Sequence, residues 1–129
     1  IRTDCPGGWD GDLVNAFTGE GLTAEQKNMQ TFLKAVLNYR KSSQAIHDGK
    51  TIHFAPFMGT YFLFRIYEDE IVAVIVHKNN EPITIDLKRY AEIGLKGKTL
   101  KNIITGESFN WGDNITFDSK GITILTTKL

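Results

Sequence analysis

Carboxylates are the side chains in this sequence most suited to chemistry, because a pair of them can act as general acid and general base. Asp4, Asp10 and Asp12 lie in a glycine-rich stretch, where aspartates commonly accept hydrogen bonds from nearby backbone amides. The acidic run 68–70 lies at a predicted hairpin turn, where charge is expected for solvation. Neither group has the arrangement of an acid and base pair, so we expect no catalytic residue in this chain.

Histidine and cysteine offer little more. His47, His53 and His77 lack the spacing of metal ligands and have no cysteine pair nearby, so we expect ordinary strand or loop residues. The single cysteine, Cys5, has no neighbouring base in the sequence to activate it and no partner for an internal disulfide. A nucleophile or a metal centre built from these residues is therefore not predicted.

Asp10, Asp12 and Asn15 have a spacing that resembles calcium ligation, but no glutamate closes the loop. The glycines at 7–8 and 19–21 lack the lysine and the strand-to-helix setting of a phosphate-binding loop. We therefore expect no metal and no cofactor in this chain.

Two tryptophans are candidates for binding, because sugars stack on flat aromatic rings in sites where a few polar groups fix their orientation. Trp9 lies in the glycine-rich stretch, and Trp111 ends a predicted strand. Aromatic rings also fill the interiors of β domains, so a place in the core is the alternative for each.

The composition is that of a folded protein. It has no excess of basic side chains that could bind a polyanion. Of 129 residues, 41% are hydrophobic and 23% are charged, and the 15 basic side chains equal the 15 acidic ones. This balance argues against nucleic acid or an anionic membrane as a partner. Because the sequence starts at Ile1 rather than at a methionine, we expect a fragment of a longer protein.

The elements fall into two groups. Residues 1–22 are irregular, and a helix is predicted over 24–41 with Thr23 and Gln26 as its capping box. This helix has one apolar stripe and no partner of its own. The stripe consists of Met29, Phe32, Leu33, Val36 and Leu37.

From residue 50 the pattern alternates with a period of two, which predicts strands separated by turns. The predicted strands are Thr51–Phe54, Tyr61–Tyr67, Ile71–His77, Ile83–Leu87, Thr99–Ile104, Ser108–Trp111, Ile115–Phe117 and Ile122–Thr126. With no helices predicted between them, the fold class is mainly β, an antiparallel β-sandwich or barrel. The run Ile71–Val76 is apolar throughout, so it is predicted to be a central strand buried on both faces.

Four stretches together resemble one enzyme family. Arg2–Trp9 (RTDCPGGW) and Asn15–Thr18 (NAFT) resemble the segment after the last barrel strand in glycoside hydrolase family 13, the α-amylase family. Leu37–Lys41 resembles the end of the last barrel helix of those enzymes, and His53–Pro56 the start of their C-terminal β domain. The resemblance is closest to the neopullulanase and cyclomaltodextrinase branch, in its Bacteroides-type form.

The resemblance implies two parts: residues 1–45 as the loop and last helix of an incomplete (β/α)8 barrel, and 46–129 as a C-terminal β-sandwich domain. The parent enzyme would hydrolyse α-1,4 glucosidic bonds in starch, maltodextrin, pullulan or cyclodextrin by a retaining mechanism, with its catalytic carboxylates upstream. The fragment itself would be inactive and would stabilise the barrel. A non-catalytic carbohydrate-binding module stays open as the alternative, and calcium stays open for the parent only.

The resemblance also implies where substrate would lie and what the chain would meet. Arg2, Asp4 and Trp9 would line the active-site face, or would only hold the loop to which they belong. Trp111 is a further sugar-binding candidate, on the grounds of its aromatic ring and not of the resemblance. The partner would be an α-glucan oligosaccharide bound through the parent, in the periplasm or outside the cell. An exposed apolar helix stripe would also favour one of two outcomes: the helix folds back on the sandwich, or the fragment forms a homodimer or domain swap.

Overall fold

The computed structural model describes residues 5–128. They form two α-helices, one 3-10 helix and eight strands. The chain divides into two compact units, residues 1–37 and 38–129, which are described separately below. The described helices include none long and apolar enough to cross a membrane.

In the first unit, short polar side chains hold an irregular loop. The Asp12 carboxylate accepts hydrogen bonds from the Gly8 and Trp9 backbone amides at 3.1 and 3.0 Å. Asn15 accepts in the same way from the amides of the two residues at 17–18. These carboxylate and amide oxygens therefore serve the backbone of their own loop, as expected for aspartate and asparagine in such a stretch.

Helix α1 (Ala24–Ser42) begins at the predicted capping box. The Gln26 side chain accepts from the Thr23 amide at 2.9 Å, and the Thr23 hydroxyl accepts from the Gln26 amide at 3.2 Å. These two bonds satisfy backbone donors that the first turn of a helix leaves free. No residue of α1 is buried, and Met29 and Leu33 of the predicted apolar stripe are exposed.

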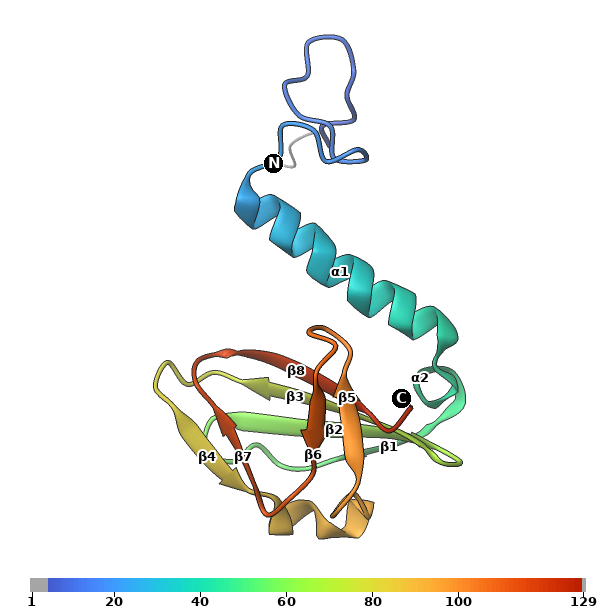
Figure 1. The fold of residues 1–129 in the computed structure, drawn as a ribbon, viewed down its shortest axis with the longest axis vertical. Helices are drawn as coiled ribbons and strands as arrows, with labels where there is room; N and C mark the ends of the chain where they lie inside the picture. The colour runs from blue at the N-terminus through green and yellow to red at the C-terminus, as the bar shows by residue number, and fades with distance from the viewer. Residues whose placement is uncertain (1–4, 129) are drawn as a thin grey trace. The chain divides into compact units, whose positions relative to one another are not determined.

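The second unit is an antiparallel β-sandwich preceded by the short helix α2 (Gln44–Asp48), which confirms the predicted fold class (Figure 1). Its strands are β1 (Lys50–His53), β2 (Thr60–Tyr67), β3 (Glu70–His77), β4 (Ile83–Asp86), β5 (Thr99–Asn102), β6 (Ser108–Asn110), β7 (Asn114–Phe117) and β8 (Gly121–Thr126). Six of them form a sheet in the order β1-β2-β3-β8-β5-β6, and β4 pairs with β7. Figure 1 shows the β4–β7 pair at the end of the sandwich away from α2.

The core lies between the two sheets and is rich in aromatic rings. Tyr90 is the centre of this cluster: its ring stacks on Phe62 at 4.1 Å and meets Phe54 edge to face at 4.8 Å between centroids. From the smaller sheet, Ile85 and Ile115 face each other in register and are both buried. Alternation along each strand thus places one apolar set inside, as the sequence pattern predicts.

Tyr90 belongs to a 3-10 helix, η1 (Leu87–Ile93), so the prediction of strands without intervening helices is wrong at this position. Leu87, Tyr90 and Ile93 are all buried, at the three-residue spacing that places side chains on one side of a 3-10 helix. The prediction that β3 is buried on both faces holds for most of the strand. It fails at Val76, which is 41% exposed.

Candidate functional site

Glu70, the first residue of β3, is the most unusual polar residue of the second unit. It is only 8% exposed, whereas its neighbours Glu68 and Asp69 are exposed in the hairpin turn. The expectation that the whole acidic run 68–70 is solvated is therefore wrong at Glu70. A carboxylate can be buried at acceptable cost only when hydrogen-bond donors surround it.

Three donors do so, and all precede the first strand. The Ser43 hydroxyl donates to Glu70 Oε1 at 2.7 Å, the Tyr39 hydroxyl to the same oxygen at 3.1 Å, and the Ala45 amide to Oε2 at 3.2 Å. The Tyr39 hydroxyl also lies 2.8 Å from Thr126 Oγ1 on β8. Glu70 therefore connects the segment 39–45, which precedes the first strand, to β3, an inner strand of the larger sheet.

The electrostatics of the site favour a charged carboxylate beside a neutral phenol. Burial acts to raise the pKa of Glu70, but hydrogen bonds from Ser43, Ala45 and Tyr39, with the charge of Lys128, outweigh it and lower the pKa below its ordinary value. Burial, reinforced by the charge of Glu70, raises the pKa of Tyr39. Tyr39 therefore remains a donor at neutral pH.

Arg65 of β2 holds the opposite end of α2. Its Nε donates to the Ala45 carbonyl at 3.0 Å and its Nη2 to the Ile46 carbonyl at 2.9 Å, and Nη1 donates to the Thr51 hydroxyl. Ser43 begins the helix, accepting from the Ile46 amide at 3.3 Å. Since a helix this short is not stable alone, these side chains from β2 and β3 account for its formation. We call Glu70, Arg65 and Ser43 the α2 clamp.

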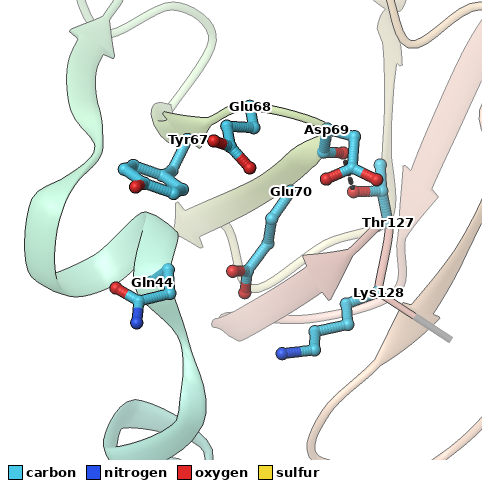
Figure 2. A pocket seen from close by; sticks show the side chains of 7 residues that line it. All are labelled: Gln44, Tyr67, Glu68, Asp69, Glu70, Thr127 and Lys128. Atoms are coloured by element: carbon cyan, nitrogen blue, oxygen red, sulfur yellow. Dashed lines mark hydrogen bonds between the residues drawn. The ribbon is translucent and has the colours of Figure 1, made fainter.

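A pocket of about 260 Å³ opens beside the clamp (Figure 2). It is lined by Gln44, Tyr67, Glu68, Asp69, Glu70, Thr127 and Lys128. Figure 2 shows the Tyr67 ring, the carboxylates of the turn and the Lys128 ammonium around one space. The Thr127 hydroxyl donates to the Asp69 carbonyl at 3.0 Å, which fixes the turn against the C-terminal strand. A sugar ring could stack on the aromatic ring of such a pocket, with the carboxylates and the ammonium group binding its hydroxyls.

Trp111 lies in the core. It is 2% exposed, and its ring meets Phe64 and Phe109 edge to face at 6.1 Å. This placement favours the core interpretation of Trp111 over a sugar-stacking role, because neither face of the ring is open to a ligand.

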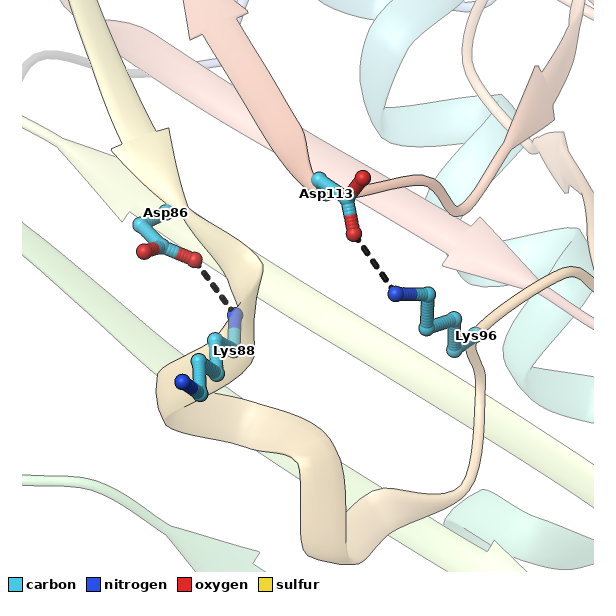
Figure 3. Close-up of polar contacts among 4 residues, drawn as sticks. All are labelled: Asp86, Lys88, Lys96 and Asp113. Atoms are coloured by element: carbon cyan, nitrogen blue, oxygen red, sulfur yellow. Dashed lines mark hydrogen bonds and ion pairs between the residues drawn. The ribbon is translucent and has the colours of Figure 1, made fainter.

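The surface near Trp111 is polar. The Lys96 ammonium pairs with the Asp113 carboxylate at 2.7 Å, and the Lys88 amide donates to the Asp86 carboxylate at 2.7 Å (Figure 3). Both side chains of the ion pair are exposed. Such a pair adds little to stability and does not form a catalytic arrangement.

The remaining predicted site residues are Trp9, Arg2 and Asp4. Trp9 is 77% exposed in the first unit, which leaves its ring available for stacking. Arg2 and Asp4 lie outside the described residues. Within residues 5–128, no group of three or more His, Cys, Asp or Glu side chains could hold a metal ion.

Sequence patterns do not identify Glu70 as a buried residue. One local indication is present: Ser43, a residue type favoured at helix N-caps, directly precedes α2. The partners of Glu70 come from up to 31 residues earlier in the chain, at Tyr39, and no local pattern reveals such a contact.

Comparison with known proteins gives a family and a fold. Residues 51–126 match the family described as the cyclo-malto-dextrinase C-terminal domain. AmyP, solved in complex with maltose, is similar with a TM-score of 0.70 and 16% identity over 85% of this chain and 22% of that one. An α-amylase from Anoxybacillus gives 0.57 and 17%, over 74% and 21%. The α-amylase of Geobacillus thermoleovorans, complexed with acarbose, gives 0.54 and 15%, over 73% and 21%.

At these identities the structural likenesses concern the fold alone, and the chain spans about a fifth of the length of these three proteins. The family match is different in kind, because it covers more than half of the chain and nearly all of its strands. It agrees with the α-amylase-family resemblance, while the neopullulanase branch stays a prediction. The chain therefore belongs to the cyclo-malto-dextrinase C-terminal domain family.

Proposed function

We propose that this chain is the C-terminal part of an α-glucan-degrading glycoside hydrolase, in which its β-sandwich stabilises a catalytic domain upstream. The observation that carries the proposal is the match of residues 51–126 to a family defined as a C-terminal domain. The parent enzyme would cleave α-1,4 glucosidic bonds, and a neopullulanase-like preference among starch, pullulan and cyclodextrins is the finer part of the proposal. Its catalytic carboxylates would lie in the upstream domain.

The geometry of the described residues supports a non-catalytic role for the fragment. Among residues 5–128 the one buried carboxylate is Glu70, whose oxygens accept hydrogen bonds from Tyr39, Ser43 and Ala45. A general acid or a nucleophile needs a carboxylate that faces substrate. Glu70 instead faces the segment 39–45 of its own domain, which is consistent with a structural role.

Deletion tests this role. In the parent protein, removal of residues 50–129 should lower the thermal midpoint or make the protein insoluble, because the surface covered by the β-sandwich would be exposed. Thermal unfolding and maltodextrin hydrolysis would be measured on both forms. A truncated parent with the same midpoint and the same activity would refute the proposal.

A second candidate function is carbohydrate binding by the domain itself, which the pocket at Tyr67 favours. Its ring stands beside the carboxylates of Glu68 and Asp69, in a space of about 260 Å³. Calorimetry of this chain with maltoheptaose tests it. Saturating heat that disappears in Tyr67→Ala would support the pocket, and heat that disappears only in Trp9→Ala would support the N-terminal loop. Flat heats in the unchanged chain would exclude a binding module.

Two further parts of the proposal rest on the family resemblance and on α1. The parent would act on α-glucan oligosaccharides in the periplasm or outside the cell, which fractionation of the source cells would test. The fragment would form a homodimer through the exposed residues Met29, Leu33 and Leu37 of α1. A sedimentation coefficient that stays that of a monomer at all concentrations would exclude the dimer.

A further inference from the structure

A second cavity, of about 480 Å³, lies where η1, the end of β4 and the segment 111–114 meet. Backbone hydrogen bonds fix its walls to one another. The Leu87 amide donates to the Asp113 carbonyl at 2.8 Å, and Asp86 pairs with Asn114 in the smaller sheet. The cavity is therefore preformed, and its volume lies in the range typical of small-molecule sites.

The lining of this cavity includes a nearly buried side chain whose polar atom has no protein partner. Trp111 lines the cavity and is 2% exposed. Within residues 5–128 its indole N–H has no acceptor, whereas the one fully enclosed side-chain atom without a partner is Nδ1 of His77. The indole nitrogen therefore keeps an opening at the edge of the ring. A donor in this position needs an acceptor from water or from a ligand.

The rim of the cavity carries two carboxylates, of Asp86 and Asp113, and two ammonium groups, of Lys88 and Lys96, so its charges cancel. Lys96 is held by Asp113 at 2.7 Å, and one oxygen of Asp86 accepts from the Lys88 amide (Figure 3). The second oxygen of each aspartate bonds to no other residue in the described part of the chain. Since a hydroxyl both donates and accepts, a rim of this kind suits a neutral ligand with several hydroxyls.

We infer that this cavity binds one unit of a neutral sugar through its hydroxyls, with the Trp111 indole N–H donating to one of them. Leu87 and Ala91 add apolar surface for the C–H groups of the sugar ring. Because the faces of the Trp111 ring are covered, recognition depends on hydrogen bonds, unlike in the pocket at Tyr67, where a ring is available for stacking. The inference concerns this domain alone and does not rest on the proposed function.

NMR titration of the full chain with glucose and with maltose tests the inference. In a Trp9→Phe background, Trp111 gives the one remaining indole N–H signal. We expect saturable shifts of this signal and of the backbone amides of 112–114. The dissociation constant should be on the order of millimolar, as for a hexose unit of about a dozen non-hydrogen atoms. The amides of 67–70 report the pocket at Tyr67 separately.

Gly112→Leu is the variant that fills the cavity. Gly112 has no positive φ, and a Cβ at this position would meet no atom within 4 Å, so a larger side chain fits without strain. It should weaken the response of Trp111 to sugar at least about tenfold, because the leucine occupies the space of the ligand. Thr84→Leu, which places a leucine at an exposed position of the same small sheet, is the matched control and should leave the response unchanged.

A Trp111 signal that moves with neither sugar, or that moves equally in Gly112→Leu, would overturn the inference. A larger response to inorganic phosphate than to glucose would also overturn it, since the lysines of the rim would then select an anion. If Gly112→Leu does not keep its fold in urea unfolding, Asp113→Ala at the exposed rim replaces it. This substitution should weaken the response several-fold, because it removes an acceptor from the rim, and an unchanged response would refute the site.

Discussion

Glu70 brings a negative charge into the β-sandwich without a lysine or arginine hydrogen-bonded to it among the described residues. Its oxygens accept instead from two hydroxyls and one backbone amide. Hydrogen bonds to a charged acceptor are stronger than neutral ones, and a carboxylate deprived of them in a buried place is costly. Glu70 is thus one of the two sheet side chains, with Arg65, that attach α2 to the larger sheet.

Glu70→Gln should lower the free energy of unfolding by about 2 kcal/mol, because a neutral amide accepts more weakly and turns one NH₂ group toward donors. Urea unfolding of this chain measures the change. Glu68→Gln, in the adjacent exposed turn, is the matched control and should change the value by less than about 0.5 kcal/mol. Equal effects of the two substitutions would contradict the structural role of Glu70.

His77 is the second residue whose surroundings were not evident from the sequence. It is 7% exposed at the end of β3, stacks on Phe117 at 4.3 Å, and its Nδ1 is buried without a hydrogen-bond partner in the described structure. Burial lowers the pKa of His77 below 6.5. The imidazole in the native state is therefore neutral at neutral pH and binds its proton at a lower pH than an exposed histidine would.

This pKa has a consequence for stability. Between the lowered pKa and 6.5 the unfolded chain binds more protons at His77 than the native chain, so the free energy of unfolding should fall as the pH decreases through that window. His77→Phe keeps the stacked ring and removes the titrating group, so its stability should change less with pH. Urea unfolding at about pH 7.5 and about pH 5.5 compares the two proteins, with His53→Phe as the exposed control. An unchanged pH dependence in His77→Phe would refute the assignment.

At the scale of elements, α2 is a short helix that depends on hydrogen bonds from side chains of β2 and β3. Its five residues cannot form a stable helix alone, and Arg65 and Glu70 supply partners for its two ends. The 3-10 helix η1 is a comparable case, because burial of Leu87, Tyr90 and Ile93 holds it against the core.

Arg65→Met should release the C-terminal end of α2. The amides of His47 and Gly49, which donate to Ser43 and Ala45 carbonyls, should then exchange with solvent deuterium at least about tenfold faster. Hydrogen exchange read by NMR would show it. Arg89→Met is the control, since Arg89 lies over the Phe57 ring and not at α2. Unchanged exchange in Arg65→Met would mean that the helix does not depend on the clamp.

The length of an element decides whether the sequence can predict it. The strands are long enough for their alternation to be read, and all eight predicted strands occur, with ends that differ by a few residues or fewer. Elements α2 and η1 have five and seven residues, too few to display a helical period against their surroundings. The candidate site was missed for a related reason: Glu70 follows an acidic turn in sequence, and its burial depends on residues from before the first strand.

At the scale of the whole domain, the two sheets share one core through η1. Phe62 and Phe64 of the larger sheet and Phe117 of the smaller one lie in a single cluster with Tyr90. A shared core of this kind should make the sheets unfold together.

Tyr90→Ala should cost about 3–5 kcal/mol, since it removes a ring from the centre of that cluster. Tyr90→Phe, which keeps the ring, should cost less than about 1.5 kcal/mol. Urea unfolding followed by far-UV circular dichroism and by Trp111 fluorescence, in a Trp9→Phe background, tests both points. Separate transitions for the two probes would show that the sheets are independent.

The position of the clamp also bears on how such a domain can be transferred from one protein to another. The donors to Glu70 all come from residues before β1, whose first residue is Lys50. A recombination point placed at the first strand would keep every strand and separate the carboxylate from all three of its donors. A crossover within the first half of α1 would instead carry Tyr39, Ser43 and Ala45 along with the sheet that depends on them. The junction in a chimaeric protein should therefore be placed inside helix α1, before the β-sandwich that is transferred.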